Sequence, residues 1–141
     1  MNGGAGFMKL SKVKETFNTK IVIAGELKSP TNLILANLCH EALLYVATRC
    51  TPLVLLREKV DETETVFRLI TGAKSIIDPG TPDFESETEH LMIDEDLSYA
   101  VINKMCALYS REAKNIVKFE NEVKTIVNDF KANFLRIGDG T

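Results

Sequence analysis

The two histidines of this chain lie nearest to known patterns of chemical sites. His40 is followed by Glu41, but no histidine stands three residues after Glu41. The second ligand of a His-Glu-x-x-His zinc helix is therefore missing. We interpret His40 as a histidine at the edge of the core or on the surface.

The second histidine stands in an acidic stretch, where an imidazole and carboxylates can bind a divalent cation. The weak candidates for such ligands are His90, Glu87 and Glu89. Their spacing fits no defined metal loop, because the glycine of an EF-hand turn is absent. We therefore expect no metal site and no cofactor.

Two further patterns fail as catalytic sites. Residues 3–6 (Gly-Gly-Ala-Gly) have no lysine after them and no strand before them, so they do not form a phosphate-binding loop. Cys39 is adjacent to His40, and neighbours on a helix point in different directions, so this histidine does not activate the thiol. Because the sequence shows no pattern typical of a nucleophile, an acid–base pair or a phosphate site, we expect that the protein is not an enzyme.

Composition places the chain among ordinary globular proteins. It has 141 residues, 45% hydrophobic content and a net charge of −3, which suits one domain with a real core and gives no general attraction to nucleic acid or membranes. The lysines of the last predicted helix alternate with acids, so we expect no sequence-specific nucleic-acid binding. No run reaches the roughly 20 apolar residues of a membrane span. Three cysteines at unrelated spacings favour a reducing, intracellular setting.

Apolar periodicity predicts helices over most of the chain. We expect a first helix at about 10–20, with Ile21–Ile23 either extending it or forming a brief strand. A second helix, Pro30–Arg49, begins with a serine and a proline and ends before Pro52. Because apolar residues surround much of its circumference, we expect it to be the central helix.

The stretch from Ile93 to Phe134 carries two apolar stripes that are out of phase with each other. Their junction is polar, so we predict two helices, about 94–110 and 115–135, broken near Arg111–Asn115 and folded back as an antiparallel pair. Their apolar faces are predicted to close over the second helix. We expect a flexible leader at 1–9, a single helical domain at 10–136 and a flexible tail at 137–141.

The least helical part lies between the second and third predicted helices. Leu53–Val60 and Val66–Thr71 are short apolar runs around three polar residues, which predicts a β-hairpin, and Ser75–Asp78 adds a third extended piece. An acidic loop follows, so the whole insertion covers about 53–92. Residues 61–96 hold eleven acids against two basic residues. The predicted fold is mainly α, an antiparallel bundle of three to four helices with a small β-hairpin or extended insertion.

Several short strings of residues carry a family resemblance over about residues 10–135. They are Asn37–Leu43 with Thr51-Pro52, Phe67–Ile70, Ile76–Pro79, Ile93–Leu97 followed by Ala100, and Tyr109-Ser110. In this order they resemble the small head–tail adaptor (head-completion or connector) proteins of tailed bacteriophages and prophages. The insertion at 53–92 is longer than in the simplest members of that family.

The resemblance implies a non-enzymatic structural component of the virion. Such a protein docks on the portal ring as a homo-oligomeric ring, extends the DNA channel towards the tail and meets neighbouring tail or stopper proteins. It would be found in the bacterial host cytoplasm and in the virion, and it can be a monomer in solution. An acidic inner surface, for which 83–96 is the candidate, would let DNA pass without binding it. The expected partner-binding residues are Asp83, Glu85, Arg57, Arg68 and Arg136.

A second interpretation stays open on the residues alone. The chain also fits a small cytosolic helical module, antitoxin-like or regulatory, that binds a partner protein and has no catalytic activity. Neighbouring genes separate the two, since portal, terminase and capsid genes would accompany a connector.

Overall fold

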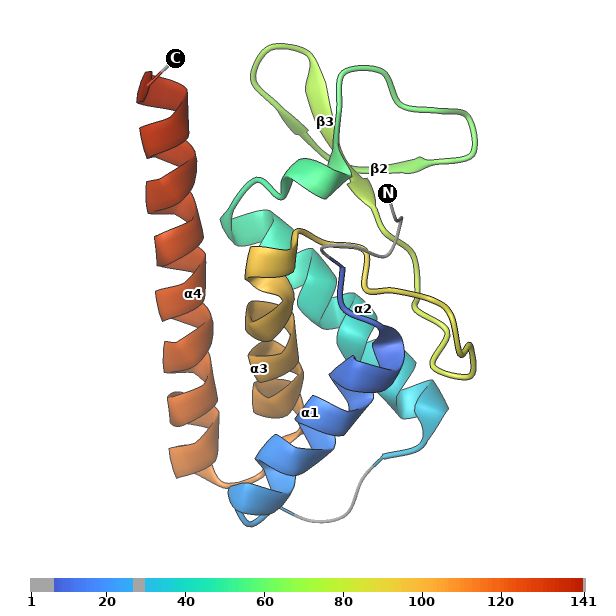
Figure 1. Cartoon of the computed structure of the whole chain (residues 1–141), viewed down its shortest axis with the longest axis vertical. Coiled ribbons are helices and arrows are strands. Elements are labelled where there is room, and N and C mark those ends of the chain that lie inside the picture. Colours follow the sequence, from blue (N-terminus) through green and yellow to red (C-terminus); the bar gives the residue numbers. More distant parts are fainter. Residues whose placement is uncertain (1–6, 27–29, 141) are drawn as a thin grey trace.

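A computed structural model describes residues 7–26 and 30–140, with side chains up to residue 133. The described part is mainly helical, with four α-helices and a small antiparallel sheet of three strands (Figure 1). The helices are α1 (Leu10–Ile23), α2 (Asn32–Arg49), α3 (Ser98–Tyr109) and α4 (Ala113–Gly140). The strands are β1 (Leu56–Arg57), β2 (Thr65–Ile70) and β3 (Lys74–Asp78), and two 3₁₀ turns are η1 (Leu53–Leu55) and η2 (Glu95–Leu97).

The central helix is α3. Nine of its 12 residues are buried, and it packs against α1, α2 and α4. The prediction that the helix at 30–49 is central is therefore wrong. The start of α2 leaves Leu33 and Ile34 exposed, whereas the small residues Ala100, Cys106 and Ala107 of α3 let neighbouring helices approach from several sides.

Helix α4 packs along α3 by one apolar face. Its buried residues recur at steps of three and four, as expected for one face of a helix, and they are Phe119, Val123, Val127 and Phe130. They join the main core together with residues of the other three helices. The two helices run antiparallel (Figure 1). The predicted break near Arg111–Asn115 is confirmed, since α3 ends at Tyr109 and α4 begins at Ala113.

Helix α1 includes Ile21–Ile23, which settles the open choice at this segment in favour of helix. Just before it, the Leu91 N–H donates to Met8 O at 2.7 Å and the Leu10 N–H donates to Glu89 O at 3.0 Å. The end of the predicted leader is thus paired with the chain that leads to α3, while residues 1–6 lie outside the described residues. Helix α4 continues to Gly140, through most of the predicted tail at 137–141.

The helix start at 30–31 also differs from the prediction. The N-cap of α2 is Thr31, whose Oγ1 accepts a hydrogen bond from the Ile34 N–H at 3.3 Å. Helix α2 therefore begins at Asn32 rather than at Pro30. The predicted capping serine, Ser29, lies outside the described residues.

The sheet has the strand order β1-β3-β2, with both pairs antiparallel. The predicted hairpin between 53–60 and 66–71 is wrong, because β3 lies between these two segments and pairs with each of them. The predicted third extended piece is in fact the central strand. The chain reverses between β2 and β3 at Gly72 (φ +88°) and Ala73 (φ +63°), backbone conformations that suit a tight turn.

The sheet has a small apolar cluster of its own, separate from the main core. Its buried members are Ala47 at the end of α2, Leu55, Ile76 and Ile77. The sheet is thus attached to the C-terminal end of α2, and it projects beyond α1, α2 and α3 in Figure 1. We call the helices the body, and residues 53–92 the insertion.

Candidate functional site

Asp94 joins the body to the insertion. This buried carboxylate stands before η2, and it accepts hydrogen bonds from the Leu53 N–H (Oδ2, 2.8 Å) and the Val54 N–H (Oδ1, 2.8 Å). It therefore caps the first turn of η1, where free N–H groups favour a negative charge. The sequence analysis placed Asp94 at the start of the helix predicted at about 94–110. No local pattern reveals its role, because its partners lie 40 and 41 residues away.

Arg68, an expected partner-binding residue, has an internal role. Its Nε donates to Ala47 O and its Nη2 donates to Cys50 O, both at 2.8 Å. These carbonyl oxygens belong to the last turn and C-cap of α2, where a cation compensates the free acceptors and the helix dipole. Arg68 thus fastens β2 to the end of α2.

His40 and Asp78 make the third link between body and insertion. His40 Nε2 lies 2.7 Å from Asp78 Oδ1, which also accepts the Gly80 N–H at 2.8 Å. Burial acts to raise the pKa of Asp78, but the hydrogen bonds from Gly80 and His40 outweigh it and hold this pKa below its ordinary value. His40 is half-buried, and its role is to join α2 to the end of β3.

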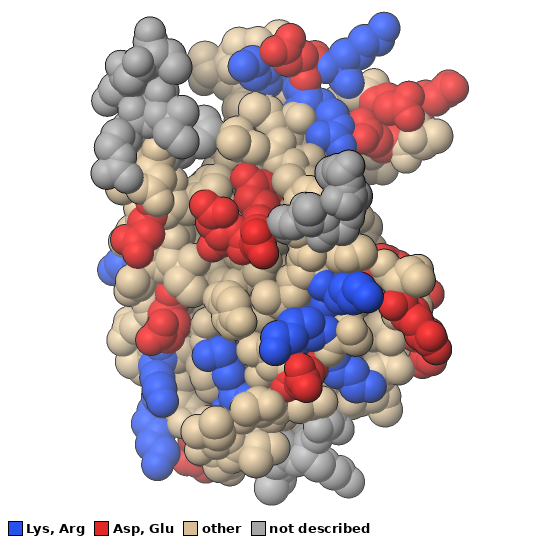
Figure 2. Space-filling model, viewed as in Figure 1, with Lys and Arg blue, Asp and Glu red and all other residues tan. Residues whose placement is uncertain are grey.

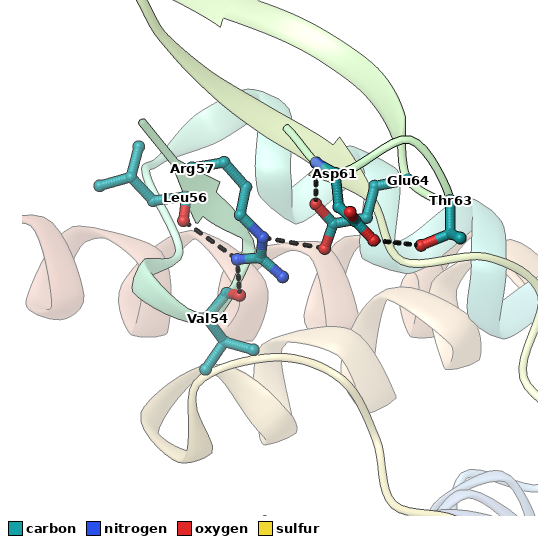
Figure 3. Close-up of polar contacts among 6 residues, drawn as sticks. All are labelled: Val54, Leu56, Arg57, Asp61, Thr63 and Glu64. Carbon is teal, nitrogen blue, oxygen red and sulfur yellow. Dashed lines mark hydrogen bonds and ion pairs between the residues drawn. The ribbon is translucent and has the colours of Figure 1, made fainter. Parts of the chain in front are cut away.

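Arg57, also an expected partner-binding residue, closes the connection between β1 and β2 (Figure 3). Its Nη1 donates to the carbonyl oxygens of Val54 (2.8 Å) and Leu56 (3.0 Å), and its Nε donates to Glu64 Oε2 at 3.0 Å. Glu64 Oε1 accepts the Asp61 N–H at 3.0 Å. The guanidinium is therefore engaged within its own segment.

Asp83 and Glu85 stand in a loop that we call the acidic loop, residues 83–89. Asp83 Oδ1 accepts the Glu85 N–H at 3.0 Å, and Glu85 Oε2 accepts the Asn32 Nδ2–H at 2.9 Å. All four of its acids, Asp83, Glu85, Glu87 and Glu89, are exposed. In Figure 2 acidic side chains gather along the right edge of the molecule, where Figure 1 places this loop.

The weak metal candidates are not brought together as ligands. Glu89 Oε2 accepts the Asp83 N–H at 3.3 Å, while His90 pairs with Lys9 through the backbone. Over residues 7–26 and 30–133, no group of three or more His, Cys, Asp or Glu side chains is placed to hold a metal ion. Arg136, the last expected partner-binding residue, lies outside the described side chains.

A groove between α2 and α4 is a candidate surface that the sequence did not indicate. Its volume is about 400 Å³. We call it the cationic groove because Arg49, Lys124 and Lys131 contribute its charge; its other lining residues are Tyr45, Glu120, Asn121, Val123, Val127 and Asn128. At its edge Lys104 Nζ lies 2.8 Å from Glu120 Oε2 and 3.9 Å from the centre of the Tyr45 ring. The Arg49 guanidinium stacks on the same ring at 4.8 Å.

Glu26 is a second long-range cap that the sequence did not reveal. Its carboxylate accepts the N–H groups of Arg111 and Glu112, each at 3.1 Å, and the Asn115 Nδ2–H at 2.7 Å. The Asn115 side chain, followed by these two backbone groups, holds the pKa of Glu26 below its ordinary value. The polar break between α3 and α4 is thus stabilised by a residue that follows α1.

The three thiols are structural. Burial raises the pKa of Cys39 far above its ordinary value, that of Cys50 to about 11 and that of Cys106 to about 12. Each side chain therefore stays a neutral thiol near neutral pH, and the thiolate that a nucleophile or a metal ligand requires is disfavoured.

No protein-family model, no curated protein and no solved structure matches this chain. Of the helices that the structure describes, none has both the length and the apolar character that crossing a membrane requires.

Proposed function

We propose that the chain is a structural head–tail connector of a tailed bacteriophage or prophage, which docks on the portal ring and extends the DNA channel towards the tail. In this proposal the protein is not an enzyme, and it assembles in the host cytoplasm as a ring that becomes part of the virion. Neighbouring tail or stopper proteins bind the face of the ring that points away from the portal.

The observation that carries the proposal is that four of the five strings behind the family resemblance contact one another or adjoining residues. His40, from 37–43, is bound to Asp78, from 76–79. Arg68, from 67–70, is bound to the end of α2 just before Thr51-Pro52. Asp94, from 93–97, is bound to the first residues after Pro52. The strings therefore include the side chains whose polar contacts hold the insertion on the body.

The exposed side of the sheet supports a partner at the insertion. Strand β2 is an edge strand, and its side chains Val66 and Leu69 are 43% and 76% exposed. Exposed apolar side chains beside an open strand edge favour contact with another protein. In the proposal this edge meets the portal.

The acidic segment at 83–96 divides into two parts. Asp94 cannot line a channel, because it is buried against η1. The exposed carboxylates that remain are those of the acidic loop and those of Glu95 and Asp96 in η2. A DNA channel would need side chains of this charge, since like charge denies DNA the phosphate contacts that give affinity.

Electron microscopy of the protein mixed with its candidate portal, taken from the portal gene beside its own, tests the proposal. We expect the wild-type protein to decorate the portal ring with density at one end. Leu69→Asp should remove the decoration, and Val117→Asp, at an exposed position of α4, should keep it. An undecorated portal at high protein concentration, or the absence of phage genes around this one, would contradict the proposal.

A further inference from the structure

We propose that copies of this chain join head to tail, with the acidic loop of one copy seated in the cationic groove of the next. Closure of these contacts into a ring rests on the proposed function, whereas the contact between two copies does not. The contact gives the expected ring a defined pair of surfaces.

The cationic groove holds charge that the described part of its own chain does not neutralise. Arg49, Lys124 and Lys131 are exposed, and none of them is in an ion pair among the described side chains. The one carboxylate in the lining, Glu120, is already bound by Lys104. The groove can therefore accept carboxylates from outside, and its lining also includes the apolar side chains of Val123 and Val127.

The acidic loop has the opposite character. Its acids occupy every second position from 83 to 89, with no lysine or arginine between them. Within the residues that the structure describes, their carboxylates accept hydrogen bonds only from backbone N–H groups and from Asn32, and they form no ion pair. A cationic partner outside the chain would therefore not compete with a cation of the described part of the chain.

The other acidic stretch, residues 58–64, fits the groove less well. It contains Lys59, and its Glu64 is bound by Arg57 (Figure 3). Asp61 accepts the Thr63 hydroxyl at 2.6 Å, and this bond lowers the pKa of Asp61. These acids are thus partly satisfied inside their own segment, which makes the acidic loop the better occupant.

The two surfaces lie on opposite sides of the molecule. Figure 1 places α4 and the C-terminal end of α2 at one side and the loop before α3 at the other. The loop therefore cannot fill the groove of its own copy. A contact between two unlike surfaces leaves one of each free at the ends, so it continues from copy to copy. It closes into a ring where the rotation between copies allows this, and otherwise it forms an open filament.

Charge exchange between the surfaces tests the contact. The groove variant is Lys124→Glu with Lys131→Glu, and the loop variant is Glu85→Lys with Glu87→Lys. In sedimentation velocity at low salt, the wild-type chain should form oligomers that dissociate as salt is raised. Each variant alone should associate about tenfold more weakly or worse. An equal mixture of the two variants should associate again, because the unchanged groove of the loop variant then meets the unchanged acidic loop of the groove variant.

Two matched controls make the same change of charge elsewhere. Lys114→Glu with Lys118→Glu alters α4 outside the groove, and Glu58→Lys with Glu62→Lys alters the other acidic stretch; all four positions are exposed. Both controls should keep the wild-type association. A comparable loss in the controls would show a general charge effect and overturn the proposal.

Other outcomes also overturn it. A wild-type chain that stays monomeric at the highest attainable concentration in low salt has no such contact. If the groove variant loses association and the loop variant associates normally, the groove binds a different acidic segment. The acidic loop would then be free to line a channel. Loss of portal decoration with self-association intact would refute the proposed function alone. Portal decoration by a strictly monomeric protein would refute the contact alone.

Discussion

The body and the insertion are held together by different kinds of interaction. In the body, apolar faces of all four helices meet in one core around α3. The insertion has only four fully buried apolar side chains in its cluster, one of them from α2. Polar contacts of Asp94, Arg68 and His40 hold most of it on the body. Its end is held by Leu91, which is buried in the main core and whose N–H donates to Met8 O.

Because of this difference, we expect the body to provide most of the stability and the insertion to provide partner recognition. Apolar burial is non-directional and sums over many side chains, so the body can be stable without any one contact. The polar links of the insertion are directional and few, and each one fixes the position of a segment. We therefore expect the insertion to open locally at a lower free energy than the body, as partner-binding segments commonly do.

The largest effect is expected from a charge in the body core. Val123→Asp would bury an unpaired carboxylate at a position that is 2% exposed, and it should lower the free energy of unfolding by about 4 kcal/mol or more. Phe130→Asp should act alike. Urea denaturation measures both, with Val117→Asp on the exposed side of α4 as the control. Folded variants that lose only partner binding would mean that this face is an interface and not core.

Removal of the Asp94 carboxylate should affect the insertion more than the body. Asp94→Ala leaves the N–H groups of Leu53 and Val54 without their acceptor, at a cost of about 2–3 kcal/mol. Amide hydrogen exchange should accelerate at Leu53 and Val54 while α3 stays protected. Asp96→Ala, at an exposed position two residues away, should change little. Equal acceleration in α3 would show that body and insertion unfold together.

Loss of the Arg68 cap should have a smaller effect. Arg68→Ala removes two hydrogen bonds to the end of α2 and should cost about 1–2 kcal/mol, seen as faster exchange in β2. Arg68→Lys keeps the charge but cannot reach both carbonyl oxygens with one planar group. It should therefore fall between wild type and alanine. A lysine variant as stable as the wild type would show that Arg68 acts through its charge alone and not through its two hydrogen bonds.

The smallest effect is expected at Glu26, and it depends on pH. The folded-state pKa of Glu26 is lowered, so its contribution is present above the unfolded pKa and is lost as pH falls through the folded pKa. Glu26→Gln should weaken the start of α4 at neutral pH and remove part of the acid dependence of unfolding. Thermal unfolding of both proteins across the acidic range measures this. Parallel pH profiles would contradict a capping role.

The sequence predicted the body better than the insertion. Apolar steps of three and four residues located α3 and α4, and the polar residues between them located the break. The central helix was predicted wrongly, because periodicity shows that a helix has an apolar face but not how many other helices pack against it. The small residues Ala100, Cys106 and Ala107 make α3 central, and their meaning depends on the packing around them.

The insertion was harder to predict because its contacts are distant in sequence. The runs around β1 and β2 looked like a hairpin, but the turn at Gly72 and Ala73 pairs β2 with β3 instead. Arg57 and Arg68, the expected partner-binding residues of the insertion, also make hydrogen bonds within the chain that the sequence did not indicate. The cationic groove combines residues of α2 and α4 that no local pattern connects.

Hydrogen exchange with and without the candidate portal tests the central claim most directly, that a stable body carries an insertion suited to a partner. In the free protein, amides of α3 should exchange only on global unfolding, and those of β2 should exchange faster. With the portal ring added, protection should rise in β2 and stay constant in α3. Equal protection of β2 and α3 in the free protein, or no change in β2 with the portal, would contradict the account.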